Sequence, residues 1–348
     1  MQEKMVKALR LKGFDPVFFV SHLLILLLSY SIYLAPYIAP STFPYFGFVP
    51  IFYPAIVLFN VLLIGILVLR RRLFGIIFIV LSAGLLPPLF KSYQFFGDKV
   101  EAKSDFKLLT FNVHYLRDAE VAVFEDFFRK ENADVVLLQE VWWKDKKFEA
   151  LKEASFSDYY HEKNTLNQVF SRYPIIEFRP IFSDLPGTTA YACYADIDTG
   201  EDTLRIINVY LEPMHINKEL IKEGVNSTEH AKTNSKILKN KLTEGFLRHQ
   251  KQIQELIPFI QHSPHPVILA GDLNAVPNSY EYKQISFWLR DSYIDVGRSS
   301  GTTFHDYKFP LRLDYVFHSD ELLSVGYKVL RKQKISDHYP VVAELKLP

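Results

Sequence analysis

Five short segments place carboxylates, amides or imidazoles at the ends of apolar runs. Asn112 and His114 in LLTFNVHYL are two residues apart, as are Asp272 and Asn274 in VILAGDLNAVPN, so an extended strand would direct each pair to one face. The other three segments contribute Gln139, Glu140, Asp314, Asp337 and His338. Oxygen ligands with an imidazole suit a hard divalent cation such as Mg²⁺ and general acid–base groups. The sequence has one cysteine and no paired-histidine spacing, so zinc is not favoured.

Each segment also has an ordinary structural explanation. Asp272 and Asn274 could form an Asx turn, Asp337 could be a cap, and His338 could be a hydrogen-bonded surface histidine. For any one segment alone, this explanation is the more common one. Five such segments in one chain favour a shared site.

The elements that would position these groups follow from the apolar pattern. Short apolar runs predict strands at residues 108–111, 134–138, 204–211, 266–270, 313–317 and 341–347. Val121, Phe124 and Phe128 share one face of a predicted helix, and a longer helix is predicted over residues 233–261. Residues 212–231 are polar and aperiodic, which predicts a long loop and a candidate substrate-facing flap.

The first ninety residues have the composition of a membrane segment. Residues 16–69 contain no Asp, Glu, Lys or Arg in 54 positions, enough for two crossings at about 20 residues each. We expect about three transmembrane helices, at residues 16–37, 49–69 and 73–90, then a linker at 91–105 and a domain at 106–348. The alternative of a cleaved signal peptide is disfavoured because the apolar stretch is too long and rich in proline.

Charge is unevenly divided between these two parts. Up to Ser104 there are ten basic and four acidic residues, and after it 30 basic and 35 acidic, so the parts carry +6 and −5. The positive-inside rule places the N-terminus in the cytoplasm and, after three crossings, the large domain outside. If the run at 73–90 only dips into the interface, that domain would instead be cytoplasmic. In both cases we expect an integral membrane protein whose partners include the lipid bilayer.

The segments GDLN, RLDYVF and SDHYP, in this order, resemble the endonuclease/exonuclease/phosphatase superfamily. Its members include pancreatic-type deoxyribonucleases, abasic-site endonucleases, neutral sphingomyelinases and inositol polyphosphate 5-phosphatases. The resemblance covers about residues 106–347. It implies an α+β fold of two packed β-sheets flanked by helices, a four-layer αββα sandwich, and hydrolysis of phosphoester bonds with Mg²⁺, or alternatively Mn²⁺, as cofactor.

The resemblance also implies a role for each site residue. Glu140 would be the principal metal ligand with Asn112 beside it, and Asp337 is a further candidate ligand. Of the remaining residues, Asp272 would orient and deprotonate the attacking water, and Asn274 would hold a phosphate oxygen. The cationic form of His338 would bind the phosphoryl oxygen. Asp314 would orient the His338 ring. Such positioning and charge neutralisation are what phosphoryl transfer requires.

Two positions depart from the pattern of the superfamily. Tyr210 stands where many members carry histidine, although abasic-site endonucleases have tyrosine there. A phenol can donate a hydrogen bond to the phosphate or the leaving group but cannot supply positive charge near neutral pH. The alternative for Tyr210 is a core or cross-strand residue. His114 stands where abasic-site enzymes carry aspartate, which leaves a second carboxylate ligand in doubt.

The class of phosphoester is left open by the sequence. A net charge of −5 does not favour a polynucleotide, and the lysines at 218–241 are interspersed with acids. Membrane attachment would favour a phospholipid headgroup. The alternative from another function class is a catalytically inactive, membrane-tethered binding module of the same fold. Such a module should have lost at least one catalytic residue, and none of those expected is missing from this sequence.

Overall fold

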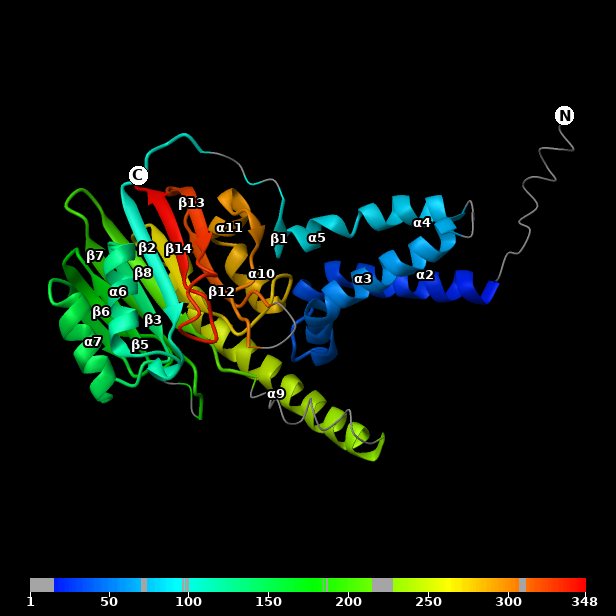
Figure 1. Ribbon diagram of the computed structural model, residues 1–348, viewed down its shortest axis with the longest axis horizontal. Coiled ribbons are helices and arrows are strands. Elements are labelled where there is room, and N and C mark those ends of the chain that lie inside the picture. Colours follow the sequence, from blue (N-terminus) through cyan, green and yellow to red (C-terminus); the bar gives the residue numbers. More distant parts are fainter. Residues whose placement is uncertain are drawn as a thin grey trace, which may run out of the picture.

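The computed structural model describes residues 16–69, 74–95, 97, 100–183, 185, 187–214, 228–306 and 311–348, without the side chains of residues 16, 74 and 228–233. The basic N-terminal residues, the arginines at 70–72 and most of the predicted flap lie outside this set. A β-sandwich makes up most of the described chain, and the N-terminal helices project from one side of it (Figure 1).

The sandwich consists of two six-stranded sheets. In order across the first sheet, the strands are β13 (Leu323–Val329), β14 (Val341–Lys346), β2 (Phe106–Asn112), β3 (Val135–Gln139), β5 (Asn167–Ser171) and β4 (Tyr160–Asn164). The second sheet has the order β10 (Arg290–Asp291), β12 (Asp314–His318), β9 (Val267–Asp272), β8 (Thr203–Tyr210), β7 (Tyr191–Asp198) and β6 (Ile175–Pro180). Parallel pairing is confined to β2 with β3 and β8 with β9, at the centre of each sheet.

Alternation along the central strands builds three apolar layers. In β2, Leu108 lies in the core between the sheets, whereas Leu109 and Phe111 pack under the helices α6 (Val121–Glu131) and α7 (Lys146–Phe156). The outer face of the second sheet packs against α9 (Thr228–Gln261) and α10 (Tyr280–Ser286). The predicted four-layer αββα sandwich is therefore confirmed (Figure 1). By the same alternation Asn112, four residues after Leu108, is directed between the sheets.

Most differences from the expected elements are small. All six predicted strands are present, and α9 begins five residues before the predicted start at 233. Strand β2 ends at Asn112, so His114 is not on the strand as expected but begins a 3₁₀ turn, His114–Leu116, with φ of 45°. The predicted linker at 91–105 contains β1 (Tyr93–Gln94), which pairs with β11 (Ser299–Ser300).

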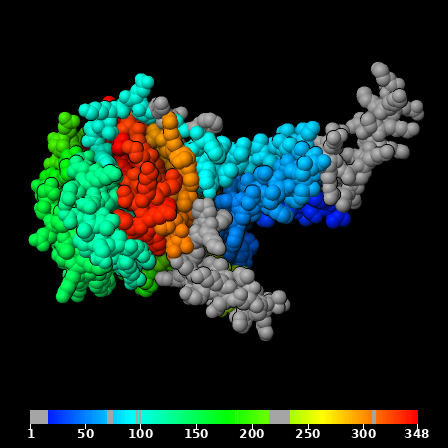
Figure 2. Space-filling view, in the orientation of Figure 1, coloured from blue at the N-terminus to red at the C-terminus, as the bar shows by residue number. Residues whose placement is uncertain are grey.

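The helices before the sandwich, in residues 16–69 and 74–90, form what we call the N-terminal bundle (Figure 2). It contains α2 (Pro16–Tyr30), α3 (Phe48–Leu69), α4 (Phe74–Ala83) and α5 (Leu86–Phe90). Residues 31–47, the interhelical connection, join α2 to α3 through three short 3₁₀ turns, Ser31–Tyr33, Ala35–Tyr37 and Pro44–Gly47. Two segments, Val17–Tyr37 and Pro44–Leu69, are long and apolar enough to cross a membrane. They correspond to the first two predicted spans.

The third predicted span, 73–90, is not one helix, because α4 ends at Ala83 and α5 begins at Leu86. Pro87 and Pro88 have no N–H to donate to the carbonyls four residues earlier, which breaks the helical hydrogen bonding here. The Gly84 carbonyl instead accepts a hydrogen bond from the Tyr33 hydroxyl. A Cβ on Gly84 would lie 2.3 Å from the Tyr30 hydroxyl, so a larger residue there would displace the Tyr30 ring.

Polar side chains lie inside the N-terminal bundle and apolar ones on its surface. The His22 ring lies 2.8 Å from the Asn60 side-chain oxygen, and the Asn60 amide donates to Ser82 Oγ at 2.7 Å, which links α2, α3 and α4. His22 and Asn60 are completely buried. Leu24 and Leu58, in contrast, are each 60% exposed. Apolar side chains also fill the rest of the interior, so the exposed apolar surface is what distinguishes these helices from those of a water-soluble protein.

Candidate active site

Strand pairing brings the predicted site residues to one edge of the sandwich. In the second sheet, Asp272 at the end of β9 lies opposite Asp314 of β12 on one side and Tyr210 of β8 on the other. In the first sheet, Asn112 at the end of β2 lies opposite the last residue of β3, which Glu140 follows. Because the two sheets pack face to face, residues more than 100 positions apart in the chain can meet here.

The backbone near these residues adopts uncommon conformations. Gly271 has φ of 141°, and a Cβ there would lie 1.9 Å from the Val209 carbonyl oxygen, so the approach of β9 to β8 beside Asp272 requires glycine. Glu140 and Asn274 have φ of 56° and 45°, in the left-handed region that non-glycine residues rarely adopt. Such conformations are often found at functional sites.

Asn112 connects the two central carboxylates. Its Nδ2 donates to Glu140 Oε1 at 3.0 Å and to Asp272 Oδ2 at 3.1 Å. The Tyr210 hydroxyl donates to the same Glu140 oxygen at 3.0 Å. Burial, together with the charges of Glu140 and Asp272, raises the pKa of Tyr210 well above its usual value, so the phenol remains a proton donor. The outcome is a Glu140 carboxylate held by two neutral donors.

His338 joins this network from the opposite side. Its Nδ1 lies 2.8 Å from Asp314 Oδ2, and its Nε2 lies 3.7 Å from Asp272 Oδ2. Burial lowers the pKa of His338, but the charges of Asp314 and Asp272 outweigh burial and raise it to about 10. Burial raises the pKa of Asp272, although the His338 charge opposes this shift. The arrangement favours an imidazolium beside a carboxyl group with increased proton affinity.

Asp272 and Asn274 form an Asx turn, the ordinary structural explanation given above for the segment VILAGDLNAVPN. Its backbone N–H donates to Asp272 Oδ1 at 2.8 Å, and its side-chain Nδ2 donates to the Leu211 carbonyl at 2.9 Å. The turn and the site coexist, because Asp272 accepts from Asn274 through Oδ1 and from Asn112 through Oδ2.

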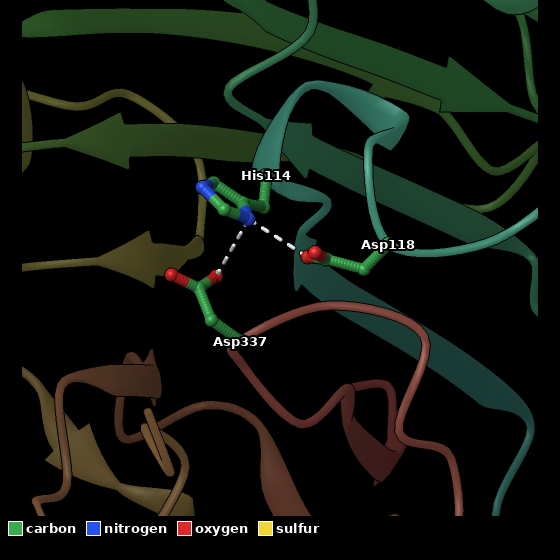
Figure 3. A group of neighbouring side chains, drawn as sticks. All are labelled: His114, Asp118 and Asp337. Atoms are coloured by element: carbon green, nitrogen blue, oxygen red, sulfur yellow. Dashed lines mark hydrogen bonds and ion pairs between the residues drawn. The ribbon is translucent and has the colours of Figure 1, made fainter. Parts of the chain in front are cut away.

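Asp337 belongs to a second group, with His114 and Asp118 (Figure 3). His114 Nδ1 lies 2.7 Å from Asp118 Oδ2 and 3.8 Å from Asp337 Oδ1. The carboxylate of Asp337 thus faces this imidazole, although Asp337 lines the same cavity as Glu140 and His338. Of the predicted site residues, the other seven are connected by the contacts around Glu140, Asp272 and His338.

A cavity of about 550 Å³ adjoins the network. Glu140, Asn274, Asp337 and His338 contribute to its polar part, and apolar side chains such as Ile51 line much of the remainder. Its volume is in the range of small-molecule pockets, about 300–1,000 Å³. Four of the eight predicted site residues therefore face a space that can admit a ligand.

Three residues that support the network were not predicted from the sequence. Ser336 Oγ donates to the Asn112 carbonyl at 2.7 Å, and Thr303 Oγ1 accepts from the Asp314 backbone N–H at 3.0 Å. Asp118 pairs with His114. Ser336 is part of the SDHYP segment and could have been found there. Thr303 and Asp118 carry no local signal, because their contacts depend on the fold.

Solved structures similar to this chain share its fold at low identity. An endonuclease/exonuclease/phosphatase from Bacteroides vulgatus is 18% identical, with a TM-score of 0.53, over 71% of this chain and 100% of the other. The D. rerio TDP2 in complex with a single-strand DNA product is 15% identical, with a TM-score of 0.53, over 69% of this chain and 98% of the other. A mannosyl-6-phosphatase from Bacteroides thetaiotaomicron has 17% identity, a TM-score of 0.51 and coverage of 69% and 99%.

Comparison of the sequence itself gives matches to two families. Residues 15–93 match a family described as a domain of unknown function, and no curated protein matches the chain. Residues 109–338, about two thirds of the chain, match the endonuclease/exonuclease/phosphatase family and contain Asn112, Glu140, Asp272 and His338. The chain belongs to the endonuclease/exonuclease/phosphatase family.

Proposed function

We propose that this protein is a membrane-anchored, divalent-metal-dependent hydrolase of phosphoester bonds. The observation that carries the proposal is the connected network of Glu140, Asn112, Asp272 and His338 beside a cavity. Membership of the family supports phosphoester hydrolysis as the general activity. An inactive binding module is disfavoured, because a complete hydrogen-bonded set of such groups would have no purpose in it.

The residues present fit a hard divalent cation. Glu140, Asp337, Asp272 and Asp314 are four carboxylates near one imidazole, His338, and no Lys or Arg occurs among the described residues that line the cavity. This excess of negative charge would repel a phosphate unless a cation offsets it. Glu140 and the Asn112 side chain would hold Mg²⁺ or Mn²⁺, with Asp337 as a further ligand. When bound, the ion neutralises charge on the phosphate oxygens.

The protein groups supply the other requirements of the reaction. Asp272, with its raised pKa, is positioned to accept a proton from a water molecule that attacks phosphorus. His338, held as a cation by Asp314, would stabilise the oxygens of the phosphoryl group as charge develops on them. Asn274 would direct a phosphate oxygen, and Tyr210 keeps Glu140 in place.

Metal dependence can be tested with bis(4-nitrophenyl) phosphate and the full-length protein in detergent. We expect release of 4-nitrophenolate to fall to background after treatment with EDTA and to return when Mg²⁺ or Mn²⁺ is added in excess. Calcium-selective EGTA is the control, and it should leave the rate in Mg²⁺ buffer unchanged. Hydrolysis that is indifferent to EDTA would refute the proposed metal requirement.

Membrane anchoring is supported by the exposed apolar surface of the N-terminal bundle and its two long apolar segments. In Figure 1, α5 and the interhelical connection meet the sandwich, whereas the first turn of α2 lies at the far end of the bundle. In a bilayer, this arrangement would put the sandwich on the side opposite the N-terminus. With the N-terminus in the cytoplasm, the catalytic domain would be extracytoplasmic.

Labelling of an introduced cysteine tests this orientation, because the single native cysteine, Cys193, is completely buried. Ser157 is exposed at the end of α7, and Ser157→Cys is nearly isosteric. We expect a membrane-impermeant maleimide to label Ser157→Cys in intact cells. Gln2→Cys, the matched variant at the N-terminus, should be labelled only after permeabilisation. The reverse pattern would place the catalytic domain in the cytoplasm.

A further inference from the structure

The N-terminal bundle forms one wall of the active-site cavity. Ile38 and Phe46 of the interhelical connection and Ile51 of α3 line this wall. The catalytic domain lines the rest of the cavity, with residues that include Phe246 of α9 and His338. A segment that lies 55 to 68 residues before the first strand of the sandwich, β2, thus completes the surroundings of the catalytic groups.

This wall is held against the catalytic domain by specific contacts. The Gln250 side chain of α9 accepts from the Ser41 backbone N–H at 2.7 Å and donates to Ser41 Oγ at 3.0 Å. The rings of Phe48 and Phe246 pack edge to face, with centroids 5.5 Å apart. A Cβ on Gly47 would lie 2.6 Å from the Phe246 ring. The two parts therefore fit closely next to the cavity.

The cavity lining combines charged and apolar side chains. Glu140 and His338 provide charged groups, and Ile51, Phe46 and Phe246 provide apolar surface. A ligand that fills it must combine a phosphate with a sizeable hydrocarbon group, because burial of apolar surface is favourable only against apolar side chains. A polynucleotide needs several Lys or Arg contacts to its phosphates. No Lys or Arg occurs among the described residues that line the cavity.

We propose that this cavity binds the hydrocarbon chain of an amphiphilic phosphoester, a lipid of the bilayer, while its phosphate reaches Glu140 and His338. The inference rests on the proposed hydrolase function and specifies its substrate class. The N-terminal bundle is then a specificity element as well as an anchor, since Ile38 and Ile51 contact the chain of the substrate.

The aromatic residues outside the cavity support a lipid source for this ligand. Tyr37, Phe43 and Tyr45 of the interhelical connection are 69%, 47% and 43% exposed. Lys239 and Lys283 lie over the rings of two of them, at 4.6 Å from Tyr45 and 5.3 Å from Tyr37. Exposed aromatic rings beside cations are typical of the membrane–water interface. The cavity therefore lies next to the level at which lipid phosphates occur.

A homologous series of alkyl 4-nitrophenyl phosphates, from methyl to octyl, tests the inference with the full-length protein in nanodiscs. Water attacks phosphorus, the bond to 4-nitrophenolate breaks, and an alkyl phosphate and a proton are released. We expect kcat/KM to rise about three- to fourfold with each added methylene until the chain fills the cavity. The methyl ester has no chain to place there and reports on the catalytic groups alone.

Ile51→Trp should fill the apolar part of the cavity. It is expected to lower kcat/KM for the octyl ester by at least about tenfold more than kcat/KM for the methyl ester, so the ratio of the two falls by that factor. Ile66→Trp is the matched control, because Ile66 lies on the same helix but is 39% exposed and does not line the cavity. If Ile51→Trp does not fold, Ile38→Trp makes the same test from the interhelical connection.

The outcomes distinguish this inference from the proposed function. Chain-length dependence that Ile51→Trp removes and Ile66→Trp retains would support it. EDTA-sensitive hydrolysis of the methyl ester with no dependence on chain length would overturn the inference and leave the hydrolase proposal standing. Faster cleavage of a short oligonucleotide than of the octyl ester, unaffected by Ile51→Trp, would overturn it in favour of nucleic acid. Absence of hydrolysis of every substrate would refute both.

Discussion

Glu140→Gln is expected to lower kcat/KM for bis(4-nitrophenyl) phosphate on the order of 10³-fold, the largest effect of any single substitution in this chain. The substitution retains the size of the side chain and can retain the hydrogen bond from Tyr210. It removes the negative charge that would hold the divalent cation. Binding of Mn²⁺, followed by electron paramagnetic resonance, should weaken in parallel with the loss of activity.

Glu344→Gln serves as the control for this variant. Glu344 lies on β14, where it pairs with the exposed Lys328 at 3.2 Å, and it does not line the cavity. Its replacement should leave both kcat/KM and Mn²⁺ binding within about twofold of the original protein. If Glu140→Gln retained full activity and full metal affinity, Glu140 would not be the principal ligand, and the group of Asp337, His114 and Asp118 would be the site to test next.

Asp314→Asn is expected to lower kcat/KM by about 10²-fold and to change its pH dependence. Asp314 is the main group that raises the pKa of His338, with Asp272 and Asp337 also contributing. Without the Asp314 charge, this pKa falls, so His338 loses its proton at a lower pH. Because the proposed mechanism uses the His338 imidazolium, the alkaline limb of the pH–rate profile should move to lower pH.

The pH–rate profile from pH 5 to 10.5 measures this shift, and His338→Gln is the companion variant. A glutamine has no charge to lose in this range, so the alkaline limb due to His338 should be absent and the rate uniformly low. If Asp314 had only a structural role, the Asp314→Asn substitution would lower the rate by the same factor at every pH. An unchanged alkaline limb in Asp314→Asn would therefore contradict the role assigned to the pair.

The central strands and their polar ends could be predicted because local sequence determines them. Buried runs such as VVLLQ of β3 have no alternative to the interior of a sheet, and Gly271 marks the close approach beside Asp272. Strand β4, with the polar sequence YHEKN, could not be predicted, because it lies at the edge of the first sheet and only its pairing with β5 makes it a strand. Tertiary pairing overrides local preference at such positions.

Contacts across the fold determine the parts of the site that local sequence does not. Asp337, a candidate metal ligand from the family resemblance, lines the cavity with Glu140, and its side chain faces His114, whose own direction depends on the left-handed turn after β2. The apolar wall of the cavity was also unpredictable. Ile51 is an ordinary residue of an apolar helix in the sequence, and only the packing of α9 against the interhelical connection places it near His338.

The paired hydrogen bonds between Ser41 and Gln250, with the adjacent Phe48 and Phe246 rings, act as a fixed joint. A catalytic domain on a flexible tether would move over a range of distances from the membrane and would encounter molecules in solution. In the proposed membrane-anchored arrangement, this joint would keep the catalytic groups at one height, where they would act on molecules that diffuse laterally past them. Turnover would then follow the mole fraction of substrate within the leaflet, and diluting the leaflet with inert lipid would slow the enzyme at constant bulk concentration.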